Sequence, residues 1–199
     1  MKKVLLATAL LATSFGASAA TISSLNDNFD SISNSTLNIP SSGLANWDVL
    51  NGTVDAISTP NSFGLSCNGG CIDLDGSSRN AGDLVSKSGF SAGLYSLSFD
   101  LSGNQRSGTD SLTVSFGDYL QTFTLASNAA WTNILISLVN VNEGDKLTFS
   151  HAGGDNIGIL LDNVSVSSSV SAVPLPAAAF LFAPALFGFM GFRRKAKKA

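Results

Sequence analysis

Short segments in the middle of the chain alternate between apolar and polar residues, as half-buried β-strands do. The clearest is residues 95–101, in which odd positions are apolar and even positions are polar. Residues 112–116 repeat the alternation, and residues 134–138 follow it more loosely. A period of two residues is typical of a strand with one buried face, so three strands are predicted here.

Further strands are predicted on short apolar runs, and turn-forming residues separate them. The runs are residues 47–50, 54–57, 120–125, 146–150 and 157–166. The turns, rich in Gly, Asn and Asp, are residues 51–52, 102–104, 143–145 and 153–156. Because long helical periodicity is absent, the pattern predicts an all-β fold, an antiparallel β-sandwich.

The N-terminus has the three parts of a secretory signal peptide. Lys2 and Lys3 precede an apolar run at residues 4–12, and an Ala-Ser-Ala sequence ends at Ala19. The run is shorter than the roughly 20 residues that span a bilayer. We therefore expect residues 1–19 to be a signal peptide that is removed on export, with Ala20 as the alternative cleavage position.

The C-terminus has the length and charge of a membrane span. Residues 173–192 contain no charged residue, and Arg193, Arg194 and Lys195 follow directly. Twenty residues match a hydrocarbon core of about 30 Å, and the basic residues favour a cytoplasmic C-terminus. The sequence predicts a transmembrane helix at about residues 177–192 and an exported body at residues 20–172.

The residues around this span form a three-part pattern: a proline motif, an apolar helix and the basic tail at residues 193–199. The motif is Val173, Pro174, Leu175, Pro176 and Ala177. The pattern resembles the PEP-CTERM sorting signal in its Val-Pro-Leu-Pro-Ala variant, with Leu175 where Glu is usual. The resemblance implies processing by an exosortase in a Gram-negative bacterium. The protein would sit in the inner membrane first, and then at the cell surface or in the extracellular matrix.

Charge is distributed unevenly between the ends and the body. Seven of the 11 basic residues lie at the two ends, whereas all 14 acidic residues lie between Asp27 and Asp162. The body therefore has four basic and fourteen acidic residues, a net charge of −10. Nucleic acid is a poor partner for such a body, because its binding depends on Lys and Arg contacts to phosphate.

A second resemblance covers residues 25–168. It rests on segments at residues 28–30, 47–49, 52–55, 72–76, 93–104 and 162–166. Their order resembles the galactose-binding-like jelly rolls of choice-of-anchor surface proteins, which are similar in fold to carbohydrate-binding modules. The resemblance implies a jelly-roll sandwich with a structural calcium between Asp30 and Asp162. The alternative is that these aspartates are solvated or bonded to backbone; calcium would also need backbone oxygens, since it takes six to eight.

The two cysteines, Cys67 and Cys71, are three residues apart with Asn68, Gly69 and Gly70 between them. An exported protein meets an oxidising compartment, so a disulfide closing this loop is predicted. A zinc site would need four ligands, more than these cysteines and one distant histidine supply.

No catalytic constellation is recognisable, and we predict a protein that is not an enzyme. His151 is the only histidine. It ends a predicted strand beside Gly153 and Gly154 without a nucleophile-elbow motif, so we expect an exposed turn residue.

Aromatic side chains are the candidates for glycan stacking. Trp47 and Tyr95 are assigned to the core, whereas Trp131 and Tyr119 flank predicted turns and are the stacking candidates. The first functional hypothesis is a non-catalytic matrix or surface protein associated with biofilm and exopolysaccharide. A carbohydrate-binding module that recognises exopolysaccharide is the alternative, and a hydrolase with an unrecognised site is the third.

Overall fold

The computed structural model describes residues 20–41, 43–78 and 80–169 of the 199-residue chain. The predicted signal peptide, the sorting motif and the basic tail lie outside these residues. Within them, no helix is long and apolar enough to cross a bilayer.

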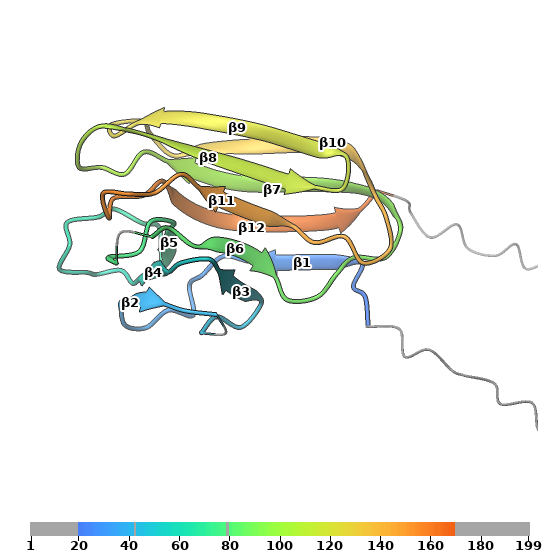
Figure 1. The fold of residues 1–199 in the computed structure, drawn as a ribbon, viewed down its shortest axis with the longest axis horizontal. Coiled ribbons are helices and arrows are strands. Elements are labelled where there is room, and N and C mark those ends of the chain that lie inside the picture. Colours follow the sequence, from blue (N-terminus) through green and yellow to red (C-terminus); the bar gives the residue numbers. More distant parts are fainter. Residues whose placement is uncertain (1–19, 42, 79, 170–199) are drawn as a thin grey trace, which may run out of the picture.

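Twelve strands in the described residues form two facing antiparallel sheets (Figure 1). The seven-stranded sheet has the order β10-β7-β12-β5-β4-β2, with β1 also pairing with β12. Its strands are β1 (Ser24–Asp27), β2 (Thr36–Ile39), β4 (Val54–Ile57), β5 (Cys71–Asp73), β7 (Gly93–Ser102), β10 (Thr132–Val141) and β12 (Leu160–Ser168). The five-stranded sheet has the order β3-β6-β11-β8-β9. Its strands are β3 (Trp47–Leu50), β6 (Asp83–Ser86), β8 (Thr109–Phe116), β9 (Tyr119–Ala126) and β11 (Thr148–His151).

This architecture confirms the predicted all-β jelly-roll sandwich, and the alternation in β7 shows why it forms. Tyr95, Leu97 and Phe99 are each at most 1% exposed and face the opposite sheet. Phe99 packs edge-on against Phe149 of β11, with ring centroids 5.3 Å apart. Trp47 and Tyr95, both assigned to the core, are 0% and 1% exposed.

A second, smaller apolar cluster lies on the outer face of the seven-stranded sheet. The connection between β4 and β5, residues 58–70, folds back over this face. The cluster contains Ile57, Leu65, Cys67, Cys71 and Leu160, with Trp131 packed against it. Adjacent Leu161 belongs to the main core. Leu160 and Leu161 of β12 therefore pack into different apolar clusters on opposite faces of the sheet, as expected where a strand is covered on both faces.

The two ends of the sandwich differ in what they carry. β1 begins and β12 ends at one end, on the right in Figure 1, which we call the terminal end. β7 ends and β10 begins at the other, which we call the pocket end. The twelve strands and both apolar clusters that the structure describes lie in residues 20–169.

Candidate functional site

A pocket of about 420 Å³ lies at the pocket end of the sandwich. Two loops form it: the β7–β8 connection and the β9–β10 connection. Its lining is Ser102, Gln105, Arg106, Ser127, Asn128, Ala129, Ala130 and Trp131. The lining combines one aromatic ring with amide, guanidinium and hydroxyl groups, the combination that recognises sugars and other polar small molecules.

Contacts with the β4–β5 connection and the second apolar cluster fix the orientation of the Trp131 ring. Its Nε1 donates a hydrogen bond to the Ser66 carbonyl oxygen at 2.9 Å, and its ring packs against the second apolar cluster. The remaining surface of the half-buried ring lines the pocket. The predicted stacking candidate thus lies where a ligand can reach it, in a fixed orientation.

Gln105 ties together the three loops at this end. Its Nε2 donates to the Ser66 carbonyl at 3.1 Å, and its Oε1 accepts from the Ser66 N–H at 2.8 Å. Its own backbone N–H donates to the Ser127 carbonyl at 2.8 Å. Gly103 permits the close approach of the β9–β10 loop, because a Cβ there would lie 2.1 Å from the Ala126 oxygen. Hydrogen bonds therefore connect the loops that line the pocket to one another.

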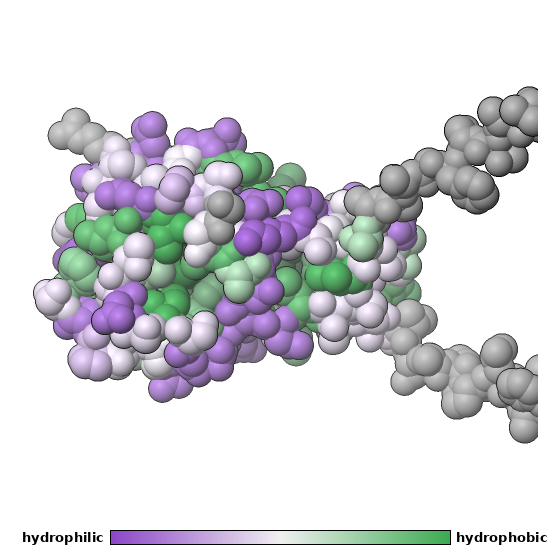
Figure 2. Space-filling model, turned by 90° about the horizontal axis from the view of Figure 1, so that it is seen from below, coloured by the Kyte–Doolittle hydropathy of each residue, from purple (hydrophilic) through white to green (hydrophobic). Residues whose placement is uncertain are grey.

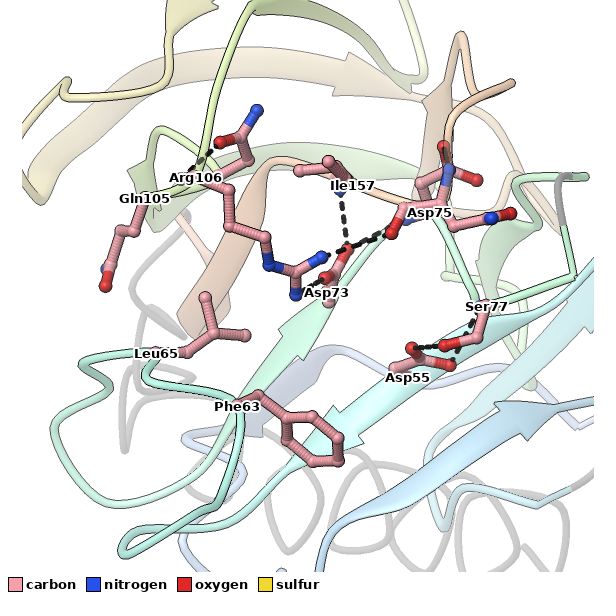
Figure 3. Close-up of polar contacts among 12 residues, drawn as sticks. Asp55, Phe63, Leu65, Asp73, Asp75, Ser77, Gln105, Arg106 and Ile157 are labelled. Atoms are coloured by element: carbon pink, nitrogen blue, oxygen red, sulfur yellow. Dashed lines mark hydrogen bonds and ion pairs between the residues drawn. The ribbon is translucent and has the colours of Figure 1, made fainter.

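Below the pocket, Arg106 forms the one ion pair found among the described residues (Figure 3). Its Nη2 lies 3.0 Å from Oδ2 of Asp73, and its Nη1 donates to the Asn156 carbonyl at 3.1 Å. Asp73 is 1% exposed, and burial raises its pKa to about 7 although Arg106 opposes the shift. The guanidinium charge next to the pocket is thus compensated inside the protein.

Two neighbouring aspartates, Asp55 and Asp75, are buried and accept several hydrogen bonds (Figure 3). Asp75, fully buried, accepts at Oδ2 from the backbone N–H groups of Gly154 and Asn156, each at 3.1 Å. Asp55 accepts from the Asn38 N–H at 2.7 Å and from the Ser77 hydroxyl at 2.7 Å. These carboxylates organise the loops, and their hydrogen bonds offset part of the cost of burying them, since Oδ1 of Asp75 has no partner among the described residues.

The predicted disulfide between Cys67 and Cys71 is confirmed, with a Cα–Cα distance of 5.8 Å. It closes the last turn of the connection that covers the second apolar cluster. Gly70 N–H donates to Oδ1 of Asp30 at 3.2 Å. Gly69 has a φ of +90°, and a Cβ there would lie 1.6 Å from the same oxygen. Only glycine fits this approach.

Asp30 and Asp162, the predicted calcium ligands, lie close enough for the Asp30 carboxylate to raise the pKa of Asp162. Asp162 is 2% exposed at the point where β12 changes partner from β5 to β1. Burial raises its pKa to about 7, and the carboxylates of Asp30, Asp100 and Asp27 raise it further. The buried acid is thus surrounded by acids, an environment that a cation would relieve.

The described residues contain no group of three or more acidic, histidine or cysteine side chains arranged to hold a metal. Asp27, Asp30 and Asp100 instead accept hydrogen bonds from neutral donors, among them Trp47 Nε1 at 2.9 Å and Asn133 Nδ2 at 2.6 Å. A calcium ion bound by Asp30 and Asp162 would therefore take most of its oxygen ligands from backbone and water.

Tyr119, the other stacking candidate, begins β9, whereas Trp131 follows the end of β9. The two side chains therefore lie toward opposite ends of the sandwich. The Tyr119 ring packs against the main core, and its hydroxyl donates to Oε1 of Gln121 at 3.0 Å. The structure does not bring Tyr119 and Trp131 into one site.

The prediction that His151 is an exposed turn residue is wrong. It is 8% exposed, and backbone N–H groups approach both ring nitrogens: Gly153 at Nδ1 (3.0 Å) and Ile159 at Nε2 (3.2 Å). Burial lowers the pKa of the imidazole. The following loop closes over the ring because Gly153 and Asn156 adopt positive φ angles. Both nitrogens therefore face backbone N–H groups of the loop that follows β11.

No pattern in the sequence singles out Arg106 or Gln105 as site residues. Their partners, Asp73 and Ser66, lie 33 and 39 positions away along the chain. No local pattern predicts contacts of that separation; the only signal is that Arg106 is one of two arginines in an acidic body.

Comparison with models of known protein families gives no match, and no curated protein matches either. Among solved structures, the K1 cleaved adhesin domain of Lys-gingipain from Porphyromonas gingivalis W83 is similar. It has a TM-score of 0.50 at 14% identity over 74% of this chain and 99% of the domain. A likeness at this identity shows a shared fold.

Two further structures are similar at lower scores. TmCBM61 in complex with β-1,4-galactotriose has a TM-score of 0.45 at 20% identity, over 65% of this chain and 91% of its own. The CBM22-1 xylan-binding domain of Paenibacillus barcinonensis Xyn10C has 0.43 at 15% identity, over 79% and 100%.

Proposed function

We propose that residues 20–172 form a non-catalytic, glycan-binding module of an exported protein, and that the sugar lies against Trp131. The observation that carries this proposal is the fixed indole of Trp131 in a pocket lined by Gln105, Arg106 and Asn128. A sugar ring offers an apolar face for stacking and hydroxyls for the surrounding polar groups. The fold shared with an adhesin domain supports a binding role.

The charges around the pocket favour a neutral sugar. Above pH 7, where Asp73 is ionised, its charge compensates the guanidinium of Arg106, and the body carries four basic and fourteen acidic residues. A uronate or sulfated glycan would meet no uncompensated positive charge at the pocket and would be repelled by the body. Hydrogen bonds to hydroxyls, by contrast, need no net charge.

Binding is tested by titrating residues 20–172 with a panel of neutral and acidic polysaccharides. We expect a neutral polysaccharide to bind and Trp131→Ala to weaken binding at least tenfold, as stacked aromatics at binding sites often do. Trp131→Phe, which keeps an aromatic face, should retain part of the affinity. Tyr119→Ala is the matched control at the other end and should bind like the wild type. If no glycan binds, the glycan-binding proposal is contradicted, and the alternative of a matrix protein that recognises no sugar is favoured.

A non-catalytic role also predicts that no bound glycan is hydrolysed. The buried orientation of His151 supports this part of the proposal. Release of reducing ends from a bound polysaccharide, with a rate that exceeds the no-enzyme control, would favour the hydrolase alternative.

We further propose that an exosortase sorts the protein through residues 173–199. Support comes from the order of the motif at Val173–Ala177, the uncharged span and the basic residues Arg193, Arg194 and Lys195. The exported form should lack residues 193–199. Mass spectrometry that finds this tail intact on the exported protein would contradict the proposal.

Calcium at Asp30 and Asp162 is likewise a proposal, supported by the carboxylates that surround buried Asp162. A ligand that binds only the folded state raises the melting temperature. Calcium should therefore raise that of the wild type but not that of Asp162→Asn. An equal effect of chelator on both proteins would argue against a calcium ion at this position.

A further inference from the structure

One side of the sandwich is built from the edges of both sheets. β10 is an outer strand of the seven-stranded sheet and β9 an outer strand of the five-stranded sheet, and both lie along the upper side of the sandwich in Figure 1. In the described part of the chain, β10 pairs only with β7 and β9 only with β8. They are ten and eight residues long, whereas the opposite edges, β2 and β3, have four residues each. We call the surface formed by β9 and β10 the edge wall.

The edge wall lacks the charges that normally protect an exposed edge. Neither β9 nor β10 contains a charged residue, whereas every other strand except β2 and β11 contains an aspartate. Charged side chains on an edge strand keep it from pairing with another chain, so their absence from the two longest edges leaves the backbone open to pairing.

Exposed leucines add apolar surface to the same wall. Leu120, Leu135 and Leu138 are 72%, 67% and 66% exposed, more than any other large apolar residue described. All three belong to β9 or β10. Leu120 alternates with core-facing residues of β9 and lies on the outer face of the five-stranded sheet, whereas Leu135 alternates with core-facing residues of β10 and lies on the outer face of the seven-stranded sheet.

The outer edges of β9 and β10 differ in how regularly their backbone groups are available for pairing. The turn after β8 closes the end of β10, where Asp118 exchanges two hydrogen bonds with the backbone of Asn140 at 3.0 and 2.9 Å. β10 also has an irregular register between Ile136 and Val139. β9, by contrast, pairs with β8 without interruption from Tyr119 to Ala126, so its outer edge is regular along its whole length.

We propose that β9 of one molecule pairs antiparallel with β9 of a second molecule, which joins the two five-stranded sheets edge to edge. A strand that pairs with its own copy across a two-fold axis forms a closed, self-complementary interface. The wall is uncharged, so two bodies with an excess of ten acidic residues can meet here without placing like charges together. A charged partner would find no complementary charge on this surface. The dimer would carry two Trp131 pockets, which increases avidity for a polymer.

The proposal is tested on residues 20–172 by sedimentation velocity between about 1 and 100 µM. We expect a reversible dimer in the wild type. Leu120→Lys and Thr122→Lys place a charge on β9 and should weaken dimerisation at least tenfold. Both side chains are exposed, so the fold should be unaffected, as far-ultraviolet circular dichroism and the melting temperature will show.

Leu37→Lys is the matched control. Leu37 is 40% exposed on β2, the opposite edge of the same sandwich. Figure 2 views the molecule from below, from the β2 and β3 side in Figure 1, and shows apolar patches broken up by hydrophilic side chains. The control variant should dimerise like the wild type. A monomeric wild type at 100 µM, or equal weakening by Leu37→Lys, would overturn the proposal.

Discussion

The terminal end and the pocket end of the sandwich are stabilised in different ways. At the terminal end, three buried aromatic rings meet edge-on: Phe90 lies 4.8 Å from Phe116 and 5.5 Å from Tyr95. Backbone hydrogen bonds close the loops there, for example Phe90 N–H to the Asp145 carbonyl at 2.8 Å. At the pocket end, side-chain hydrogen bonds, a disulfide and an ion pair fix the loops.

β7 connects the two ends, and its ten residues span roughly 30 Å. An apolar end that needs no specific partners can supply stability, while a polar end can hold its groups in a fixed geometry for a ligand. The comparison indicates that stability and binding are largely separate properties in this protein. Substitutions at the terminal end should therefore change stability and leave binding intact.

Phe90→Ala removes the ring at the centre of the terminal end. Deleting a buried phenylalanine costs about 3–5 kcal/mol in the free energy of unfolding. Glycan affinity at Trp131 should stay unchanged under conditions where the variant is folded. Urea unfolding and calorimetric titration measure the two quantities; a parallel loss of affinity would show that the ends are coupled.

Arg106→Met leaves Asp73 buried without its cation. Breaking a buried ion pair lowers the free energy of unfolding. Because the Arg106 side chain is 31% exposed, we expect this loss to be about 2 kcal/mol. The loss should be larger at pH 8 than at pH 5, where Asp73 is protonated and carries no charge to leave unpaired. The double variant Arg106→Met, Asp73→Asn should recover much of the stability at pH 8. Destabilisation that is equal at both pH values would contradict this assignment.

Cys67→Ser removes the disulfide in the connection below Trp131. The closed loop is short, so the cost by the chain-entropy estimate is about 2 kcal/mol. Affinity should also fall, because Ser66 holds both Trp131 and Gln105. Dithiothreitol should reproduce both effects in the wild type and have none in the variant. An effect of the reductant on Cys67→Ser would point to another cause.

The pH dependence of stability follows from Asp162 and Asp73, whose pKa values are raised to about 7. A carboxyl group with a raised pKa in the folded state stabilises that state below its unfolded pKa of about 4, and this contribution is lost as pH rises through 7. In chelator, the melting temperature should therefore fall between pH 5 and pH 8. Asp162→Asn should reduce this fall by about 2–4 °C, the shift that about 1 kcal/mol produces in a domain of this size. A fall of the same size in the variant would show that Asp162 does not contribute.

The sequence predicts the fold well where one face of a strand is buried. Strands β3 and β4 begin and end where predicted, and β7 and β8 contain the predicted segments. β5 was missed because its three residues are all buried, since residues 58–70 cover its outer face and remove the alternation. β1, β2 and β6 were missed as well; each contains at most two apolar residues, whereas β3 and β4, which are equally short, contain three.

The candidate site was predicted in part. Trp131 and the disulfide follow from local features, a turn-flanking aromatic and closely spaced cysteines. Gln105 and Arg106 contribute through partners far away in sequence, which only the folded chain identifies. His151 was placed in the wrong environment because burial depends on how the loop after β11 folds back.

The central claim is that the pocket at Trp131 binds a neutral glycan. Isothermal titration of residues 20–172 with neutral and uronate-containing polysaccharides, using wild type, Trp131→Ala and Tyr119→Ala, tests it most directly. The account predicts binding of a neutral polysaccharide that Trp131→Ala weakens at least tenfold and Tyr119→Ala leaves unchanged. Equal affinity of all three proteins, or binding of uronates in preference to neutral sugars, would contradict it.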